Sequence, residues 1–144
     1  MKISALLKQD HVKIEGAIDA LNHVPADRLP DALAALRELV QRHMFVEELA
    51  VFTYLRIENG IDFSGMATLQ RQHDDILEHF DQLFPVPQPQ RPPATVDDVR
   101  MRALLQALDE HHRYEDKTLY ARLDADLSEQ QKRKVLMRLQ VCVE

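Results

Sequence analysis

A stretch of residues that occurs twice in this chain places the strongest limit on its fold. Residues 43–55 read HMFVEELAVFTYL, and residues 111–123 read HHRYEDKTLYARL. A histidine opens each stretch, and a glutamate follows four positions later in both. The apolar and aromatic residues after the glutamate also match, as Val51 with Leu119, Phe52 with Tyr120, and Leu55 with Leu123. Because these residues recur three and four positions apart, both stretches are predicted to be helices that bury the same face.

The prolines indicate where such helices end. The chain has seven prolines, and they gather within residues 25–30 and 85–93. Proline lacks a backbone N–H and clashes inside a helix, so these segments are predicted to be connections. Between them the apolar residues keep the helical period, which predicts helices at about 4–22, 31–57, 65–84, 96–123 and 128–142. Residues 1–144 are therefore predicted to form one all-α domain, an up-down-up-down antiparallel four-helix bundle with a short C-terminal fifth helix.

Each histidine–glutamate pair is expected to face the inside of this bundle. Residues four apart lie about 40° apart around a helix, so His43 and Glu47 continue the apolar stripe of their helix. His111 and Glu115 do the same in theirs. A glutamate is almost never fully buried unless it is paired or binds a metal. The two pairs therefore predict a polar site in the interior.

The other two long helices each add one histidine. His11 and Ile14 in the first helix match His73 and Ile76 in the third. With a rise of about 1.5 Å per residue, His11 and His43 both lie roughly 17 Å from the turn that joins their helices. The chain thus predicts two similar helical hairpins, with histidines that lie at one level in the first of them.

Four histidines and two glutamates in a bundle interior predict a dinuclear metal centre. Imidazole and carboxylate together suit iron, with manganese or zinc as substitutes. These side chains supply about eight bonds, against roughly twelve for two octahedral ions. An oxo or hydroxo bridge between the irons adds two bonds and leaves about one open position on each ion for O2, NO or peroxide. The candidate ligands are His11, His43, Glu47, His73, His111 and Glu115.

Some neighbouring residues stay open as alternatives. His112 and Asp116 are also four apart and could replace the pair beside them, although their alignment with residues 43–55 would lose the apolar matches. Glu15 follows the first histidine by four positions, but its counterpart in the third helix is Leu77. Glu48 and Asp116 are expected to hydrogen-bond outer histidine nitrogens or to lie at helix boundaries.

Other polar and aromatic residues are assigned to less specific places. His23 lies beside a turn and His79 lies six positions after the third-helix histidine, so both are expected at the surface. Tyr54 and Tyr114 could line a small-ligand pocket, but packing explains them equally well.

The order His … His-x-x-x-Glu … His … His-x-x-x-Glu across four helices resembles the hemerythrin-like domain, the histidine–histidine–glutamate (HHE) cation-binding family. The resemblance spans residues 4–123 and implies a four-helix bundle around a non-haem di-iron centre. It implies the same six iron ligands, with Glu47 and Glu115 as bridging carboxylates. Oxygen-carrying hemerythrins place a second histidine where Leu77 stands here, so the ligand set is more similar to the iron–sulfur-cluster repair and iron-sensing members.

The resemblance leads to an expected function and an alternative. The expected function is a di-iron protein that binds or reduces O2, NO or peroxide. The alternative is a metal- or oxygen-responsive sensor, or an iron-handling binding module, without turnover. Turnover of peroxide or NO under reducing conditions would favour the first, and metal-dependent partner binding without turnover would favour the second.

Composition limits the partners and the location. The formal net charge of −6 argues against a nucleic-acid surface, which needs a basic face. The chain has one cysteine, no apolar run long enough for a signal peptide, and no stretch approaching the roughly 20 apolar residues of a membrane span, so a cytoplasmic protein is expected. Ser128 and Gln131 form the pattern of a capping box at the start of the fifth helix, whose apolar face could contact a second copy in a homodimer.

Overall fold

The computed structural model describes residues 2–61, 64–83 and 98–143, with residues 64 and 141–143 described by their backbone alone. These residues form helices and no strand, which confirms the all-α prediction. The helical elements are α1 (Ile3–Leu21), η1 (Ala26–Arg28), α2 (Leu29–Val46), η2 (Glu47–Phe52), η3 (Tyr54–Glu58), α3 (Ser64–Leu83), α4 (Asp98–Glu115), η4 (Asp116–Tyr120), α5 (Ala121–Ala125) and α6 (Glu129–Val143). Residues 84, 96 and 97 of the predicted helices, and the proline-rich connection, lie outside the described residues.

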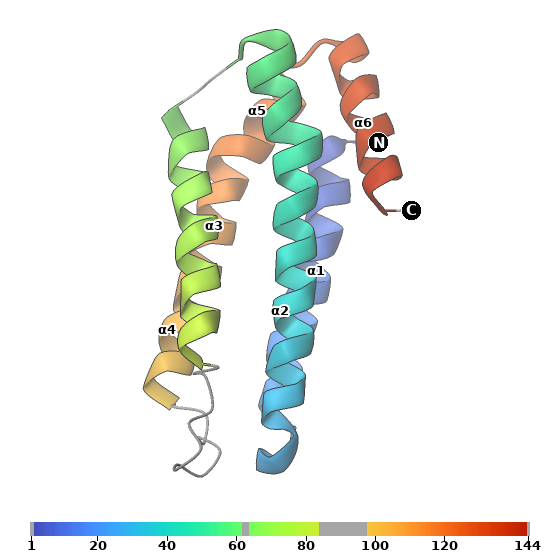
Figure 1. Cartoon of the computed structure of the whole chain (residues 1–144). Helices are drawn as coiled ribbons and strands as arrows, with labels where there is room; N and C mark the ends of the chain where they lie inside the picture. The colour runs from blue at the N-terminus through green and yellow to red at the C-terminus, as the bar shows by residue number, and fades with distance from the viewer. Residues whose placement is uncertain (1, 62–63, 84–97, 144) are drawn as a thin grey trace.

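The long helices lie side by side in pairs (Figure 1). α1 packs along α2, and α3 packs along α4. α6 packs against α1, α2 and η2, at the end of the molecule where the chain begins. This arrangement places the middle parts of all four long helices around one shared interior.

The helix from Leu29 to Glu58 shows how local sequence sets the bounds of an element. Pro30 stands in its first turn, where a missing N–H costs nothing and the fixed φ suits a helix. Gly60 follows its end with φ of +63°, a left-handed conformation that glycine adopts without a steric penalty. The N–H of Ile61 donates to the carbonyl of Leu55 at 2.8 Å and closes this end. Asn59 and Gly60 therefore form the turn that ends this helix.

The buried apolar residues form two clusters, one at each end of the long helices. The upper core, at the end near α6, comprises Ile3, Leu7, Val46, Ala50, Val51, Phe52, Tyr54, Leu55, Met66, Leu69, Leu119, Tyr120, Leu123, Leu127, Val135 and Leu139. The lower core comprises Ile14, Leu21, Leu33, Leu36, Val40, Met44, Ile76, Phe80, Leu83, Leu104 and Leu108. On each long helix, the buried histidines and glutamates come between residues of the two clusters. A polar layer therefore separates two apolar cores.

Two of the long helices widen into π-helix next to this layer. η2 begins at Glu47, and η4 begins directly after Glu115. A π-helix bonds residue i to residue i+5, so the side chain five positions on comes above the first. The residue five positions after Glu115 is Tyr120, whose hydroxyl donates to Glu115 Oε1 at 2.9 Å, and its counterpart after Glu47 is Phe52. Single π-helical turns within α-helices are frequent at functional sites.

The last helix is fixed to the rest of the molecule by polar contacts. Ser128 and Gln131 form the predicted capping box, because the Gln131 N–H donates to Ser128 Oγ at 3.1 Å and the Ser128 N–H donates to Gln131 Oε1 at 2.9 Å. Arg138 Nη2 donates to both carboxylate oxygens of Glu58, at 2.5 and 2.6 Å, and the guanidinium lies over the Tyr54 ring. These contacts join α6 to η3.

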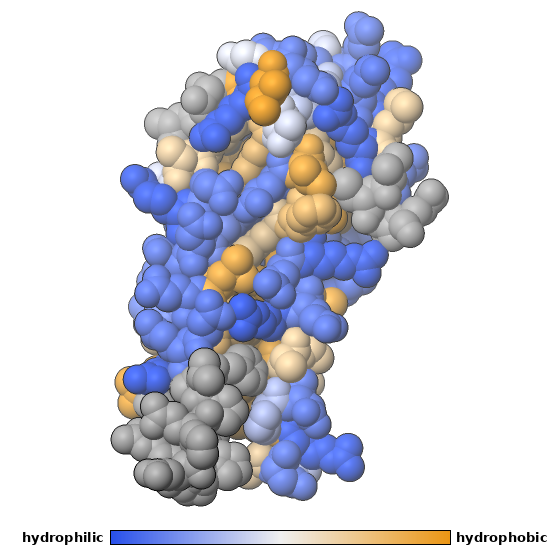
Figure 2. All heavy atoms as spheres, viewed as in Figure 1, coloured by the Kyte–Doolittle hydropathy of each residue, from blue (hydrophilic) through white to orange (hydrophobic). Residues whose placement is uncertain are grey.

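The surface is mostly polar. The face in Figure 2 is largely hydrophilic, with a few hydrophobic patches. Phe45 and Leu49, one turn apart on the helix from Leu29 to Glu58, are 58% and 44% exposed. None of the described helices has the length and apolar character that a membrane-spanning helix needs.

Candidate metal centre

The polar layer brings the six candidate ligands together from four helices. α1 supplies His11, α3 supplies His73, and the helices with the repeated stretch supply the two histidine–glutamate pairs. The side chains are fully enclosed, since both glutamates are 0% exposed and His11, the most exposed of the six, is 5% exposed. Sequence patterning placed all six on inward faces, and the structure places their donor atoms in two adjoining sets.

The first set comprises Glu47, His73, His111 and Glu115, each of which offers one atom within 4.8 Å of the others. His111 Nε2 lies 3.1 Å from Glu115 Oε2, and His73 Nε2 lies 3.6 Å from Glu47 Oε1. These same four residues carry the four buried side-chain atoms that lack a hydrogen-bond partner among the described residues, namely Glu47 Oε1, His73 Nε2, His111 Nε2 and Glu115 Oε2. They lie near one another but are not oriented for mutual hydrogen bonds.

The second set comprises His11, His43 and Glu115. His11 Nε2 lies 3.0 Å from His43 Nε2 and 2.9 Å from Glu115 Oε1. Glu115 therefore belongs to both sets, with Oε1 toward His11 and Oε2 toward His111. A carboxylate that presents one oxygen to each of two histidine groups stands where a bridging ligand would stand.

The donor atoms fit a metal better than they fit each other. Leaving a buried polar atom without a partner costs about 1–3 kcal/mol, and the first set contains four such atoms. Neutral imidazole and ionised carboxylate are ligand types that iron, manganese and zinc accept. A cation in each set would satisfy the orphaned atoms and offset the buried negative charge of the glutamates.

A comparison with protein-family models finds the hemerythrin HHE cation binding domain, which matches residues 2–123. The chain belongs to this family. Comparisons with curated proteins and with solved structures find no match. Family membership and the buried histidine–glutamate cluster together indicate that the hemerythrin HHE domain binds a metal cation.

Residues around the HHE domain's centre hold the outer nitrogens of three histidines. Glu48 Oε1 lies 2.9 Å from His73 Nδ1, as predicted for this residue. Asp10 Oδ2 lies 3.1 Å from His43 Nδ1. Gln72 Oε1 accepts from His111 Nδ1 at 2.7 Å. When Nδ1 is the protonated donor, Nε2 is left free to bind a metal, and such outer partners raise metal affinity.

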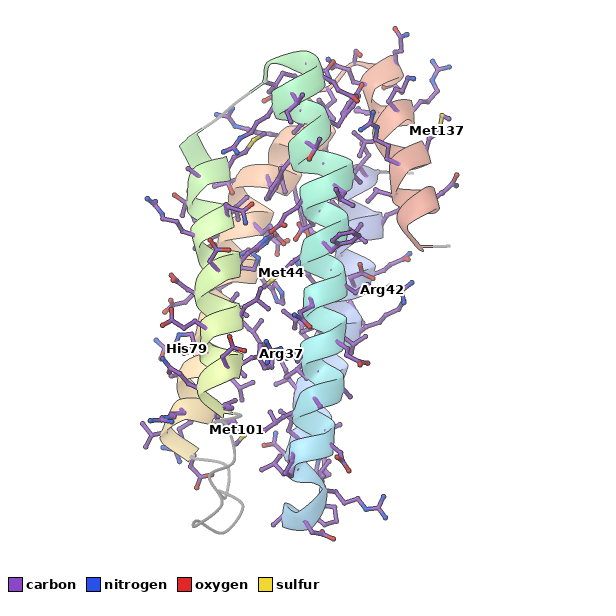
Figure 3. All side chains as sticks on the ribbon, viewed as in Figure 1. Arg37, Arg42, Met44, His79, Met101 and Met137 are labelled. Atoms are coloured by element: carbon purple, nitrogen blue, oxygen red, sulfur yellow. The ribbon has the colours of Figure 1, made fainter. Side chains whose placement is uncertain are left out.

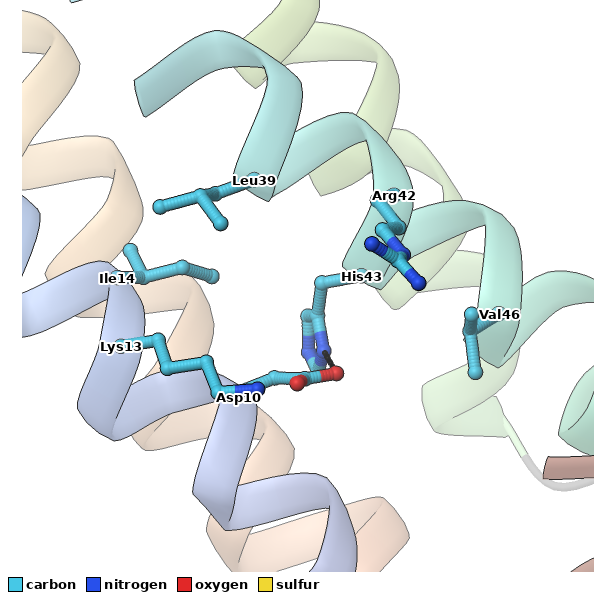
Figure 4. A pocket seen from close by; sticks show the side chains of 7 residues that line it. All are labelled: Asp10, Lys13, Ile14, Leu39, Arg42, His43 and Val46. Atoms are coloured by element: carbon cyan, nitrogen blue, oxygen red, sulfur yellow. Dashed lines mark hydrogen bonds and ion pairs between the residues drawn. The ribbon is translucent and has the colours of Figure 1, made fainter. Parts of the chain in front are cut away.

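A small surface cavity reaches one of these outer contacts (Figure 4). Its volume is about 90 Å³, and it lies between α1 and α2. Asp10 and His43 form its polar wall, and Lys13 and Arg42 also line it. Solvent therefore approaches the outer face of His43, while Nε2 of the same ring faces the buried donor set.

Removing the outer carboxylate at His73 is expected to weaken metal binding. Glu48→Ala should lower cation affinity about 10- to 100-fold, because the His73 ring loses the acceptor that fixes its orientation and tautomer. Competition with a chelator of known affinity measures the change. Asp116→Ala is the matched control, since Asp116 is the repeat counterpart of Glu48 but is exposed. Equal losses in the two variants would contradict a specific role for Glu48.

The electrostatics of the metal-free centre favour protonated histidine beside ionised glutamate. Burial opposes protonation of His73, but the nearby carboxylates of Glu115 and Glu47 and the hydrogen bond to Glu48 outweigh it and raise its pKa to about 11. Burial likewise opposes ionisation of Glu115, yet the four histidines close to its carboxylate hold its pKa well below the usual value. Protons therefore occupy, in the metal-free protein, the place that cations would take.

This proton binding makes the stability of the metal-free protein depend on pH. His73 keeps its proton up to about pH 11 when folded but loses it near its ordinary pKa of 6.5 when unfolded. The stabilisation is therefore complete below pH 6.5 and declines as the pH rises toward 11. Between pH 6.5 and 9 the loss should be of order 1–3 kcal/mol.

Urea unfolding of chelator-treated protein across this range measures the effect. The His73→Asn variant should show a smaller decline, because it has no proton to lose. The metal-loaded protein should also lack the decline, since a metal-bound imidazole carries no such proton. A free energy of unfolding that is constant from pH 6.5 to 9 in metal-free protein would contradict the expectation.

The alternative candidates belong to neither donor set. Asp116 and Glu15 are exposed, and neither belongs to a described metal-ligand group. His112 is buried, but its ring stacks on that of His11 with centroids 3.9 Å apart. Burial, together with the neighbouring His11, lowers the pKa of His112 to about 3, so it is neutral near pH 7.

The remaining residues that the sequence singled out have structural places. His23 is exposed, and His79 lies partly exposed on α3 (Figure 3). Tyr54 belongs to the upper core, and Tyr114 packs against that core. Their packing, rather than a ligand pocket, accounts for both tyrosines.

Three residues near the centre were not identified from the sequence. Asp10 and Gln72 each precede the lone histidine of their helix and contact a histidine on the neighbouring helix. Their equivalent positions in the two halves of the chain were the sequence clue that could have identified them. The hydroxyl of Tyr120 lies among the donor atoms. The sequence clue to this position was a tyrosine at a buried place where the other half of the chain has Phe52.

Proposed function

We propose that this hemerythrin HHE domain is a non-haem di-iron protein that binds or reduces a small ligand such as O2, NO or peroxide. The observation that carries the proposal is the pair of donor sets that share Glu115, because one oxygen faces each set. Two sets with one shared carboxylate support two neighbouring cations rather than one. Mixed imidazole and carboxylate donors favour iron, and manganese or zinc would also be accepted.

The proposed architecture is an up-down-up-down antiparallel four-helix bundle. The contacts between α1 and α2 and between α3 and α4 support it, as does the course of the ribbon in Figure 1. The four helices would then hold the centre from all sides. An apolar cluster on either side of the polar layer would keep bulk water from the bound ligand.

Different residues would have different roles in such a centre. The four histidines would hold the cations, and Glu47 and Glu115 would bridge them. In support, Glu47 Oε1 lies 3.0 Å from His43 Nε2 and 3.6 Å from His73 Nε2. Iron, when bound, supplies a ferrous–ferric couple and open coordination positions for the small ligand. Asp10, Glu48 and Gln72 would fix the histidine rings.

A sensor or iron-handling module is the second candidate. The observation in its favour is that donors from four separate helices meet in a single layer. Cation binding would then change how firmly these helices are held together, which a partner could recognise. Turnover of NO or peroxide by reduced protein would support the first function, whereas metal-dependent partner binding without turnover would support the second.

Metal analysis of aerobically purified protein, with its absorption spectrum, tests the proposal. Two irons per chain and oxo-to-ferric charge-transfer bands are expected. His43→Ala should lose iron, whereas His79→Ala should keep it because His79 lies outside both donor sets. Trace iron after loading the wild-type protein, or equal loss from both variants, would show that the assignment is wrong.

A further inference from the structure

The hydroxyl of Tyr120 lies inside the second donor set. Tyr120 is 1% exposed, and its Oη lies 3.0 Å from His11 Nε2, 3.5 Å from His43 Nε2 and 2.9 Å from Glu115 Oε1. Its Oη also donates to Glu47 Oε2 at 3.2 Å. The other three atoms belong to His11, His43 and Glu115, the residues of the second set. An oxygen that approaches three potential metal ligands at once has the position of a fourth.

The spacing of the four atoms matches ligands around one cation. His11 Nε2, His43 Nε2, Glu115 Oε1 and Tyr120 Oη are separated by 2.9 to 3.6 Å in every pairing. Neighbouring nitrogen and oxygen ligands with bonds of about 2 Å to one metal lie about 3 Å apart. A cation at the centre of the four atoms would therefore reach all of them at ordinary bond lengths.

The need for a fourth donor differs between the two sets. The first set has four donors without any tyrosine, since Glu47 supplies the fourth. The second set comprises His11, His43 and Glu115 among the histidine, cysteine, aspartate and glutamate residues that the structure describes. Glu47 Oε1, which belongs to the first set, lies 3.0 Å from His43 Nε2. Tyr120 Oη brings the second set to the same number.

The other half of the chain shows that this hydroxyl is not needed for packing alone. Phe52 is the repeat counterpart of Tyr120, and both rings stack on the lone histidine of a hairpin. The Phe52 ring lies 5.8 Å from His73, and the Tyr120 ring lies 5.3 Å from His11. Where the first set has four carboxylate and imidazole donors, the stacked ring is a phenylalanine without a hydroxyl.

The π-helical turn explains how the side chain reaches this place. In an α-helix, a residue five positions after Glu115 would lie about 140° away around the axis. The wide turn of η4 brings Tyr120 back over Glu115, so its hydroxyl donates to Glu115 Oε1 at 2.9 Å in the metal-free protein. The same turn therefore positions the oxygen for a cation.

We propose that Tyr120 is a fourth protein ligand of the second cation position, which it binds through its phenolate oxygen. This inference rests on the proposed function, because it assumes that both positions hold cations. Binding replaces the O–H bond with an O–metal bond, and the proton leaves to solvent, as for other metal ligands that must be deprotonated. The two positions thereby differ, since one has a phenolate ligand and the other has none.

Ferric loading provides the test. Wild-type protein with two irons should show phenolate-to-ferric charge-transfer absorption in the visible region, and resonance Raman excitation there should enhance tyrosinate ring modes. Tyr120→Phe should lose both signals. Tyr114→Phe is the matched control and should keep both, because Tyr114 packs against the upper core away from the donor atoms. The chain has three tyrosines, so Tyr54→Phe completes the assignment.

Zinc titration adds a readout that needs no redox chemistry. Wild-type protein should show the ultraviolet difference spectrum of one phenolate when the second zinc binds. Tyr120→Phe should bind the first zinc as wild type does and the second about tenfold or more weakly, with an unchanged circular dichroism spectrum.

The outcomes separate this inference from the proposed function. Wild-type protein that holds two irons without tyrosinate signals would overturn the role of Tyr120 and leave the di-iron proposal intact. Signals that persist in Tyr120→Phe would also overturn it. Wild-type protein that holds no iron would overturn both.

Discussion

Replacing Glu115 with alanine is expected to empty both cation positions at once. Its Oε1 lies 2.9 Å from His11 Nε2, and its Oε2 lies 3.1 Å from His111 Nε2. Glu115 belongs to both donor sets, whereas Glu47 belongs to the first set and approaches the second with its Oε1, 3.0 Å from His43 Nε2. The affinity of each position should fall at least about 100-fold, beyond the effect of losing an outer partner alone.

Isothermal titration with ferrous iron or zinc under anaerobic conditions measures this loss. His111→Ala is the informative comparison, because His111 belongs to the first set only and should spare much of the second. Circular dichroism shows whether each variant keeps its helices. A Glu115→Ala protein that still binds one cation with wild-type affinity would contradict the shared position of this carboxylate.

Removing the metal from wild-type protein is expected to lower its thermal midpoint by about 10 °C. A ligand at about 1,000 times its dissociation constant stabilises a fold by about 4 kcal/mol. For a domain of this size, each kcal/mol corresponds to about 2–4 °C. The effect should be large here because the cations would satisfy the four orphaned atoms of the first set.

Calorimetry of loaded and chelator-treated protein at one pH gives the comparison. The Glu115→Ala variant serves as the control, since chelator should not change the midpoint of a protein that binds no cation. An equal change in both proteins would assign the effect to the chelator. An unchanged wild-type midpoint would mean that the polar layer is stable without metal.

Much of the site was predictable because helical phase and buried charge are both readable in sequence. His43 and Glu47 share a face with the apolar stripe, and burial of Glu47 required a partner. The repeat then distinguished His111 from His112, because Val51 and Leu119 align only in one register. In the structure His111 belongs to a donor set, and His112 stacks beside one.

The π-helical turns were not predictable by the same reasoning. A period of three and four residues assumes uniform α-helix, so the position five residues after a glutamate is assigned to another face. The turns at η2 and η4 break that assumption next to the centre. Tyr120 was therefore seen as a match for Phe52 and not as a neighbour of Glu115.

The contacts to the outer histidine nitrogens were only partly predicted, for a different reason. Glu48 was expected to reach a histidine because it adjoins a candidate ligand, and it does. Asp10 and Gln72 lie partly exposed on their helices, where a polar residue needs no special explanation. Their role depends on how closely neighbouring helices approach, which the sequence of one helix does not determine.

The π-helical turns also determine which insertions and deletions these helices can accept. A π-helical turn takes up one extra residue without rotating the helix that follows it. η2 and η4 lie at nearly the same place in the two stretches, residues 43–55 and 111–123, which align without a gap. Deleting one residue from η4 alone would leave Leu123 facing the upper core but would withdraw the aromatic ring from above Glu115. Insertions and deletions in these two segments are therefore expected to alter the centre while sparing the fold.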